Sequence, residues 1–428
     1  MIVITCLDPI AGTSAQRAIA SALVDSSLLW GSVIGGTGLF QFGFSPYTTS
    51  LTGTGLFYDD GVGGMTAGTI TDIGLSVNNV PAATVTGFNL AATDLQQWID
   101  DAEAHGDLLS DVTDPLFSAN RLKVLGSNGD DLLEGGDRAD IIRGNGGNDI
   151  IIATPGNDMV LGGPGKDTVL FEDVGFFGGV SVDLGLGTAS VGPPLSPVFS
   201  YDLDSIDNVA GTPNVDLLVG NSGANQIFGL GDADTLDGRD GNDRLFGEDG
   251  DDTISGGRGN DRVDGGADDD RLFGDNGYSI SVVTDGNDHL FGRGGRDKLF
   301  GNAGDDTLNG GANRDRLNGS VGDDALTGGG GGDEFWFGYL AFRQDTSDGL
   351  AFGDDTIMDL AAGDIGVINR VGYSETAVFT KSQVNADTVI TVTAGGGGSP
   401  IGTITINNTV ANDVTVQTDT DHFSFWVV

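Results

Sequence analysis

A nine-residue phrase, Gly-Gly-x-Gly-x-Asp-x-U-x with U a large apolar residue, repeats through two stretches of this chain. The first stretch, from Gly126 to Leu170, holds five copies, and the second, from Gly211 to Trp336, holds fourteen without a slip in register. Position six is Asp in 17 of the 19 copies, and position eight is apolar in 18 of them. Such a repeat favours a coil of short strands joined by tight turns that hold a hard cation.

One copy, from Gly256 to Asp264, shows how the phrase is expected to fold. Its glycines permit positive φ, so the first six residues can form a tight turn, and Asp261 then supplies a carboxylate. The last three residues make a short strand with Val263 pointing inward. Two nonapeptides complete one coil, so the turns of copies n and n+2 stack. Strands about 4.8 Å apart then bring Asp243 close to Asp261.

Stacked carboxylates repel one another unless a cation lies between them. Two charges about 4 Å apart cost on the order of 4 kcal/mol at an effective dielectric near 20. Calcium suits such a site because it takes roughly 6–8 oxygen ligands in flexible geometry, whereas magnesium demands a tighter octahedron. Zinc prefers His or Cys, and the chain has only three His and one Cys. We therefore expect multiple Ca²⁺ ions.

The candidate calcium ligands are the aspartates at position six of the copies. They are Asp131, Asp140, Asp149, Asp158, Asp167, Asp216, Asp234, Asp243, Asp252, Asp261, Asp270, Asp288, Asp297, Asp306, Asp315, Asp324 and Asp333. Asn225 and Ser279 occupy position six in the other two copies, so sites that involve them are predicted to be weak or empty. The copy from Gly274 to Val282 also has Ser281 at the inward position. Because it keeps its nine-residue length, we predict a local defect there and not a break.

The charge balance points to cations and away from nucleic acid. The chain of 428 residues has 63 Asp plus Glu against 19 Lys plus Arg, a net charge of −44, whereas a phosphate backbone needs a basic face. Cys6 is the single cysteine, so no intramolecular disulfide can form. The first residues carry no cation before Arg17, which predicts no conventional cleavable signal peptide. No glycine-free apolar run is long enough for a transmembrane segment.

The repeats resemble those of the RTX (repeats-in-toxin, hemolysin-type) calcium-binding family. The resemblance implies a β-roll that folds on calcium and a secreted, extracellular protein. The segment Phe352–Asp364 resembles the one that commonly follows such a roll, and the apolar end Phe423–Val428 resembles the uncleaved signal of proteins exported by type I secretion machinery. This end departs from the commonest one because Ser424 interrupts its apolar run.

The fold class that follows is dominated by β-structure: a parallel β-roll, a nonapeptide solenoid with two copies of the repeat in each coil. We expect five parts. They are a small, mainly-β N-terminal domain with one or two helices (1–125), a first β-roll block (126–170), an irregular insertion that continues the solenoid (171–210), a second β-roll block (211–336) and a C-terminal β cap with the export signal (337–428). Helices are predicted over Ser14–Trp30 and from Thr93 to Gly106.

The outward positions seven and nine differ between the two blocks. In the first block they are largely apolar, as at Ile150 and Met159, which suggests that another domain covers this face. In the second block position seven is often basic or polar, as a solvated strand should be. Phe228, Phe246, Phe273, Phe291 and Phe300 at position nine are exceptions. These rings either pack on each other or on the cap, or form a ribbon for a partner.

No catalytic motif stands out, since the chain lacks both His-Glu-x-x-His and Gly-x-Ser-x-Gly. His105 lies beside acidic residues but at the end of a predicted helix, where a cation complements the dipole. His289 falls at an outward repeat position, and His422 lies near the chain end. The sequence thus favours a calcium-binding protein with a structural or binding role. A secreted polymer-degrading hydrolase or lyase with its site in 1–125 remains the alternative, and calcium-driven self-assembly is a third.

Overall fold

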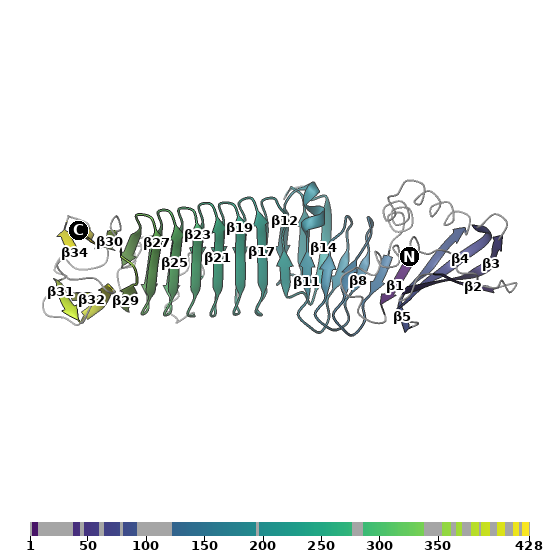
Figure 1. The fold of residues 1–428 in the computed structure, drawn as a ribbon, viewed down its shortest axis with the longest axis horizontal. Helices are drawn as coiled ribbons and strands as arrows, with labels where there is room; N and C mark the ends of the chain where they lie inside the picture. The colour runs from purple at the N-terminus through teal and green to yellow at the C-terminus, as the bar shows by residue number, and fades with distance from the viewer. Residues whose placement is uncertain are drawn as a thin grey trace. The chain divides into compact units, whose positions relative to one another are not determined.

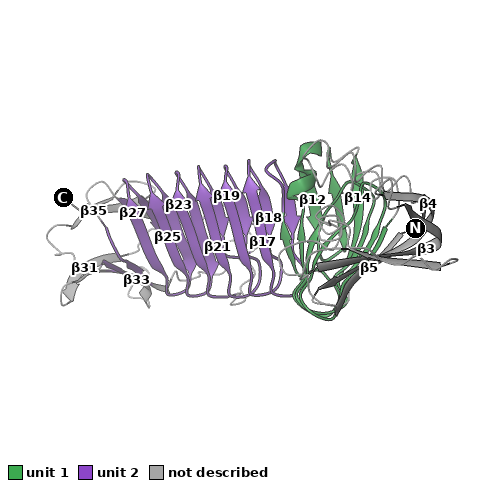
Figure 2. Ribbon diagram, turned by 45° about the vertical axis from the view of Figure 1, so that its right-hand side comes forward, with its two compact units in different colours: residues 1–210 green, residues 211–428 purple. Residues whose placement is uncertain are grey.

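The computed structural model describes most of the repeat region and the strands on either side of it (Figure 1). The described residues are 2–6, 37–42, 47–59, 64–77, 80–91, 122–193, 197–275, 286–337, 353–360, 365–369, 378–384, 387–393, 400–406, 414–418 and 422–427. The chain divides into two compact units, Met1–Ala210 and Gly211–Val428 (Figure 2). Both helices predicted near the N-terminus lie outside the described residues. In the described part of the chain, none of the helices has the length and apolarity needed to cross a bilayer.

Unit 1 begins with antiparallel strands. These are β1 (Ile2–Cys6), β2 (Thr37–Phe42), β3 (Tyr47–Asp59), β4 (Gly64–Val77) and β5 (Val80–Ala91). The pairs β2–β3, β3–β4, β4–β5 and β1–β5 are all antiparallel. On its other side β1 pairs in parallel with β6 (Leu122–Leu125), the first strand of the coil. The antiparallel strands therefore cover the coil's first edge strand, which would otherwise be free to pair with another chain.

The first block of repeats forms coils whose strands alternate between two parallel sheets. After β6 these are β7 (Leu132–Glu134), β8 (Ile141–Arg143), β9 (Ile150–Ile152), β10 (Met159–Leu161) and β11 (Thr168–Leu170). Each strand pairs with the strand two nonapeptides further on, as Ile141 does with Met159 and Leu132 with Ile150. The predicted coil of two nonapeptides is confirmed.

Residues 171–210 continue this coil around an inserted hairpin. The elements are the 3₁₀-helix η2 (Glu172–Phe177), β12 (Val180–Asp183), β13 (Thr188–Val191), β14 (Phe199–Asp204) and β15 (Asn208–Ala210). β12 and β13 pair antiparallel. β14 pairs in parallel with β10, and β15 does so with β11, so these two strands restore the coil.

Unit 2 contains the longer run of coils, whose strands lie side by side in Figure 1. Its repeat strands are β16 (Leu217–Val219), β17 (Gln226–Gly231), β18 (Thr235–Asp237), β19 (Arg244–Asp249), β20 (Thr253–Ser255), β21 (Arg262–Ala267), β22 (Arg271–Phe273), β23 (His289–Gly294), β24 (Lys298–Ala303), β25 (Thr307–Ala312), β26 (Arg316–Val321), β27 (Ala325–Gly330) and β28 (Glu334–Phe337). Even- and odd-numbered strands form separate parallel ladders, as in β18–β20 and β19–β21. The fold is the predicted parallel β-roll.

The core of the roll is the column of side chains at position eight. Leu245, Ile254, Val263 and Leu317 are all 0% exposed, and their counterparts in the other coils are at most 1% exposed. Burial of each such side chain contributes roughly 1.5–3 kcal/mol. A strand of three residues suffices because only its central residue points inward, which is the alternation that the nonapeptide encodes.

The outward aromatic rings pack mainly on one another. Phe228 stacks on Phe246 with ring centroids 4.9 Å apart, and Phe273 stacks on Phe300 at 5.2 Å. The Arg262 guanidinium lies 4.3 Å from the centroid of the Phe291 ring. These contacts favour the packing interpretation over a free aromatic ribbon.

The apolar outer face of the first block is not fully covered. Ile150 and Met159 are 43% and 40% exposed. That another domain covers this face stays a prediction.

The predicted register is wrong at one copy. Arg262 pairs with His289 and Arg271 with Lys298, so these two neighbouring coils are separated by three nonapeptides instead of two. The winding omits one nonapeptide length between Gly274 and Asp288. The physical reason lies in the copy itself, because Ser279 offers no carboxylate and Ser281 offers no apolar side chain to the core. Gly274 now takes position one of the copy whose position six is Asp288, and the alternation of sheets is preserved.

The end of the roll passes into antiparallel strands. These elements are β29 (Gly353–Ile357), β30 (Ile365–Asn369), β31 (Val378–Val384), β32 (Asp387–Thr393), β33 (Pro400–Ile406), β34 (Val414–Thr418) and β35 (His422–Val427). β29 and β30 pair in parallel with β27 and β28. β33 then pairs antiparallel with β32, and β35 with β30, so the last coils are followed by a cap of the kind expected.

Deletion of residues 276–284 should leave the roll intact. It would join Gly274-Asp275 to Asp285-Gly286-Asn287-Asp288, a regular turn sequence, and would shorten a connection whose closure costs entropy. We follow folding by circular dichroism as calcium is added, and define the calcium midpoint as the calcium concentration at which half of the protein is folded. We expect this midpoint to be unchanged or slightly lower. A large rise in that midpoint would show that the omitted residues are part of the winding.

Candidate metal centre

The turns of the repeats bring backbone carbonyl oxygens of successive coils close together. In the turn that begins at Gly256, Gly257 and Gly259 have φ of +108° and +116°, where a side chain is strained. A Cβ on Gly259 would also overlap the carbonyl oxygen of Gly241, one coil earlier. The glycines therefore permit both the tight turn and the close approach of the coils.

All 17 position-six aspartates named from the sequence are buried. Their exposed fractions lie between 0% for Asp167, Asp288 and Asp333 and 5% for Asp131. They form rows along the roll, one carboxylate per turn, as the stacking of copies n and n+2 predicts. Buried carboxylates in such rows are costly unless hydrogen bonds or cations compensate them.

In most of these aspartates one carboxylate oxygen, Oδ1, joins neighbouring coils. Asp261 Oδ1 accepts the backbone N–H of Asp243 at 2.7 Å, and Asp270 Oδ1 accepts that of Asp252 at 3.0 Å. Where the winding omits a nonapeptide, Asp288 Oδ1 accepts the N–H of Asp261 at 2.8 Å in the same way. The aspartate is thus a structural link between coils before any ion is considered.

The second oxygen points into the turn. In ten of the aspartates, Oδ2 is buried and has no hydrogen-bond partner. These are Asp149, Asp167, Asp234, Asp252, Asp270, Asp288, Asp297, Asp306, Asp315 and Asp324. An unsatisfied buried carboxylate oxygen calls for an explanation, and a bound cation supplies one.

A carbonyl oxygen lies beside this carboxylate oxygen. A Cβ built on Gly247 would overlap both Asp252 Oδ2 and the carbonyl oxygen of Gly265, which belongs to the next coil. The same two partners recur at Gly301, where they are Asp306 Oδ2 and the Gly319 carbonyl. Two oxygen acceptors thus converge on one small space, an arrangement that repels an anion and suits a cation.

Burial raises the pKa of these carboxylates, and neighbouring carboxylates raise it further. The pKa of Asp288 rises to about 9, first because burial disfavours its charge and then because Asp306 and Asp261 repel it. Burial is also the main cause for Asp234, Asp270 and Asp306, whose pKa values rise to about 8. A proton or a metal ion is therefore needed to make these positions electrostatically acceptable.

The donor set fits calcium better than a metal bound by side chains alone. Within the described ranges, no three His, Cys, Asp or Glu side chains gather into a group that could hold a metal ion. A site here must therefore draw most of its ligands from backbone carbonyls, with one carboxylate from a turn. Calcium accepts such oxygen ligands in flexible geometry.

Four positions depart from the common pattern. Asn225 carries no charge, and its Oδ1 accepts the N–H of Asn221 at 2.8 Å. In Asp131, Asp140 and Asp216, Oδ2 accepts a backbone N–H of its own turn at 2.5–2.6 Å. These turns, at the start of each block, satisfy the carboxylate internally.

Two further aspartates extend the rows beyond the regular copies. Asp207 Oδ2 accepts the N–H of Asp167 at 3.1 Å, and Asp355 Oδ1 accepts that of Asp324 at 3.2 Å. Burial, and then the charge of Asp324, raise the pKa of Asp355 to about 10. The signal for Asp355 was its place two residues before the inward Ile357, as in a nonapeptide. Asp207 likewise precedes the inward Val209 by two residues.

The histidines do not assemble a catalytic group in the described residues. His289 is exposed at an outward position of β23, as predicted, and His422 begins β35. His105 lies outside the described residues, as do the acidic residues next to it.

Comparison with known proteins identifies the repeats. The sequence model of one family, the RTX calcium-binding nonapeptide repeat, matches residues 125–160, 134–169, 211–245, 246–280, 282–317 and 309–338. No curated protein matches the chain. Among solved structures, the extracellular lipase LipA from Serratia marcescens is similar at 18% identity over 68% of this chain, with a TM-score of 0.17. The match spans only 38% of that lipase, and at this TM-score it carries no argument about activity.

Metal-free protein should fold more readily as the pH falls. An aspartate in the unfolded chain has a pKa of about 3.9, whereas that of Asp288 in the roll is about 9. Its folding contribution is therefore fully present below about pH 4 and is lost as the pH rises through 9. Circular dichroism of demetallated protein should show β-structure increasing from pH 9 to pH 5. A flat or opposite trend would contradict the burial of these carboxylates.

Proposed function

We propose that this chain, which carries RTX calcium-binding nonapeptide repeats, is a secreted calcium-binding protein whose repeats fold into a β-roll as they take up several Ca²⁺ ions outside the cell. The observation that carries the proposal is the row of buried aspartates whose Oδ2 atoms have no donor and face carbonyl oxygens of the next coil. Repeats of this family bind Ca²⁺.

The ligands in this proposal are the 17 position-six aspartates together with the turn carbonyls. The ten whose Oδ2 lacks a hydrogen-bond partner are the strongest candidates, because calcium replaces no existing bond there. Asp131, Asp140 and Asp216 must first give up the backbone N–H that each Oδ2 accepts, so sites at the start of each block should bind more weakly. The turn of Asn225 should bind most weakly of all.

Calcium binding and folding are coupled in this account. Without the ion, repulsion among carboxylates and the entropy of 74 glycines oppose the roll. Extracellular sites have dissociation constants of roughly 10⁻⁴–10⁻³ M. A site at tenfold excess of calcium over its dissociation constant adds about 1.4 kcal/mol to stability. Ten such sites add on the order of 14 kcal/mol, as much as the whole net stability of an ordinary domain.

We assign a role to the predicted parts of the chain that carry the repeats and to those that follow them. We assign calcium uptake to 126–170 and 211–336, continuity of the solenoid to 171–210, and capping and the export signal to 337–428. Export by type I secretion machinery is part of the proposal, supported by the repeats and by the apolar C-terminal segment. That segment forms β35, paired with β30 and β34, so it acts as an export signal before folding and as a cap strand afterwards.

The repeats themselves have a binding and structural role and are not catalytic. One oxygen of most of these carboxylates accepts a backbone N–H from a neighbouring coil, and the other points into a turn. Neither oxygen is placed for acid–base chemistry on a substrate. A secreted polymer-degrading enzyme with its site in residues 1–125 stays the alternative to a purely binding or structural role.

The substitution Asp252→Asn tests the ligand assignment. Asn keeps the shape and can still accept the backbone N–H of Asp234, but it removes the charge of Oδ2. We expect the calcium midpoint, followed by circular dichroism, to rise by about twofold or more, with local loosening of the adjacent coils. Asp249→Asn is the matched control, because Asp249 is an exposed residue of the same copy and carries the same charge. Equal midpoints for the two variants would overturn the assignment.

A further inference from the structure

Cationic side chains are concentrated in one place on this acidic protein. A cavity of about 360 Å³ on unit 2 is lined by Arg271, Arg296, Lys298, Arg314 and Arg316, together with Asp269, Asp270, Asp297, Asp315 and Glu334. These are five of the 19 Lys and Arg residues in a chain of net charge −44. The volume is within the range of sites for small molecules.

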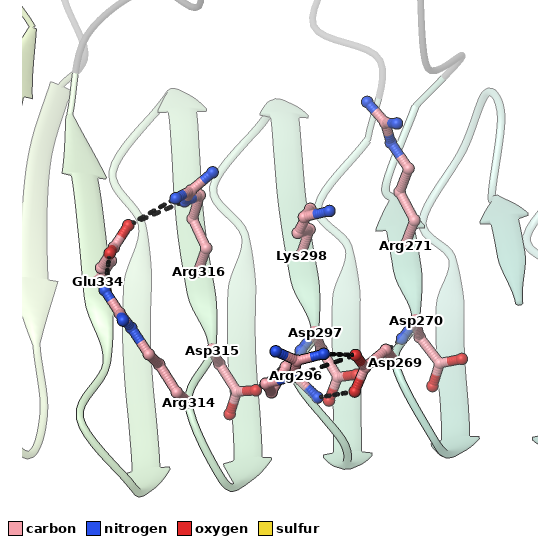
Figure 3. Close-up of a pocket in the computed structure, with 10 residues that line it drawn as sticks. All are labelled: Asp269, Asp270, Arg271, Arg296, Asp297, Lys298, Arg314, Asp315, Arg316 and Glu334. Atoms are coloured by element: carbon pink, nitrogen blue, oxygen red, sulfur yellow. Dashed lines mark hydrogen bonds and ion pairs between the residues drawn. The ribbon is translucent and has the colours of Figure 1, made fainter. Parts of the chain in front are cut away.

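The cations lie in a row because of the winding. Arg271 on β22, Lys298 on β24 and Arg316 on β26 are in register on three adjacent strands, and Figure 3 shows them side by side. Neighbouring strands lie about 4.8 Å apart, so the three positive groups are closely spaced. The omission of one nonapeptide creates this row, since an uninterrupted register would place Arg271 opposite His289.

Three of the five cations already have carboxylate partners. Arg296 pairs with Asp269 at 2.5 Å, while Arg314 and Arg316 both pair with Glu334, the latter at 2.8 Å. Lys298 is exposed and forms no ion pair with a described carboxylate. Arg271 lies over the Phe273 ring, 5.2 Å from its centroid, and its Nε is buried without a hydrogen-bond partner among the described residues. Two positive groups therefore remain for a ligand.

Calcium changes the balance of charge around the cavity. Asp270, Asp297 and Asp315 are position-six residues whose charge is offset when the turns hold calcium. The remaining lining then has five cations against the two carboxylates of Asp269 and Glu334. This step rests on the proposed function, because it requires calcium in the adjacent turns.

We propose that the cavity is a calcium-dependent binding site for a small anion, whose sulfate, phosphate or carboxylate oxygens are held by Lys298 and Arg271. Guanidinium and ammonium groups form strong, charge-assisted hydrogen bonds to such oxygens. The ligand is small because a long polyanion would meet the negative charge of the rest of the chain, whereas a short one experiences mainly charges within about 8–10 Å. The anion comes either free or on a sugar-sized molecule.

The test is calorimetric titration of the full calcium-loaded chain with inorganic sulfate, glucose 6-sulfate and neutral glucose. We expect both anions to bind and glucose not to bind, with affinity falling as sodium chloride is added. Tighter binding of glucose 6-sulfate than of sulfate would identify the anion as one carried on a sugar, and the reverse order would identify a free ion. Absence of binding by both anions to protein that is folded and calcium-loaded would overturn the proposal.

The variant Lys298→Gln locates the site. Loss of one charged hydrogen bond should weaken anion binding by about tenfold. Arg244→Gln is the control, because Arg244 is an exposed position-seven cation on the other ladder, and it should leave binding unchanged. Equal binding by both variants would overturn the assignment to this cavity. Calcium midpoints measured in parallel keep this failure distinct from failure of the proposed function, in which calcium itself would not bind.

Discussion

The burial of carboxylates stacked one coil apart is the constraint on which the rest of the roll depends. The roll buries an aspartate in nearly every turn, and burial together with neighbouring carboxylates moves the pKa of Asp288 to about 9. A chain that places such groups in rows is stable only if protons or cations accompany them. Calcium meets that requirement at neutral pH, where protons are too scarce. The free-energy cost of burying these carboxylates without calcium therefore makes folding depend on calcium.

In the proposed function, folding and calcium binding depend on the same aspartate side chain. In most of the aspartates Oδ1 accepts a backbone N–H of the previous coil, as between Asp270 and Asp252, and Oδ2 faces the turn. The inward residue two positions later, such as Leu272, fills the core. Loss of one carboxylate thus weakens the coil ladder and the ion site together. The copy with Ser279 and Ser281 has neither the carboxylate nor the inward apolar residue. The strand register omits one nonapeptide length at this place.

Much of this could be predicted from the sequence because the period is strict. The nonapeptide phase predicts the coil of two copies, the inward position eight and the stacking of position-six carboxylates. The structure confirms all three, except for the register at the copy that begins at Gly274. The predicted strand register was wrong after Gly274. A segment one nonapeptide long can be left out of the coil without changing the nine-residue phase on either side, so the sequence does not reveal the omission. Asp355 was missed because its strand follows a segment that breaks the glycine pattern. The row of Arg271, Lys298 and Arg316 depends on which coils become neighbours, and so only the structure reveals it.

The most direct test is to measure the hydrodynamic radius and the thermal unfolding of the full chain while calcium is added to demetallated protein at pH 7.5. We predict an expanded chain with little β-structure at first, and then cooperative compaction as several ions bind to each molecule. Demetallated protein that is already as compact and as heat-resistant as the calcium-loaded form would contradict it.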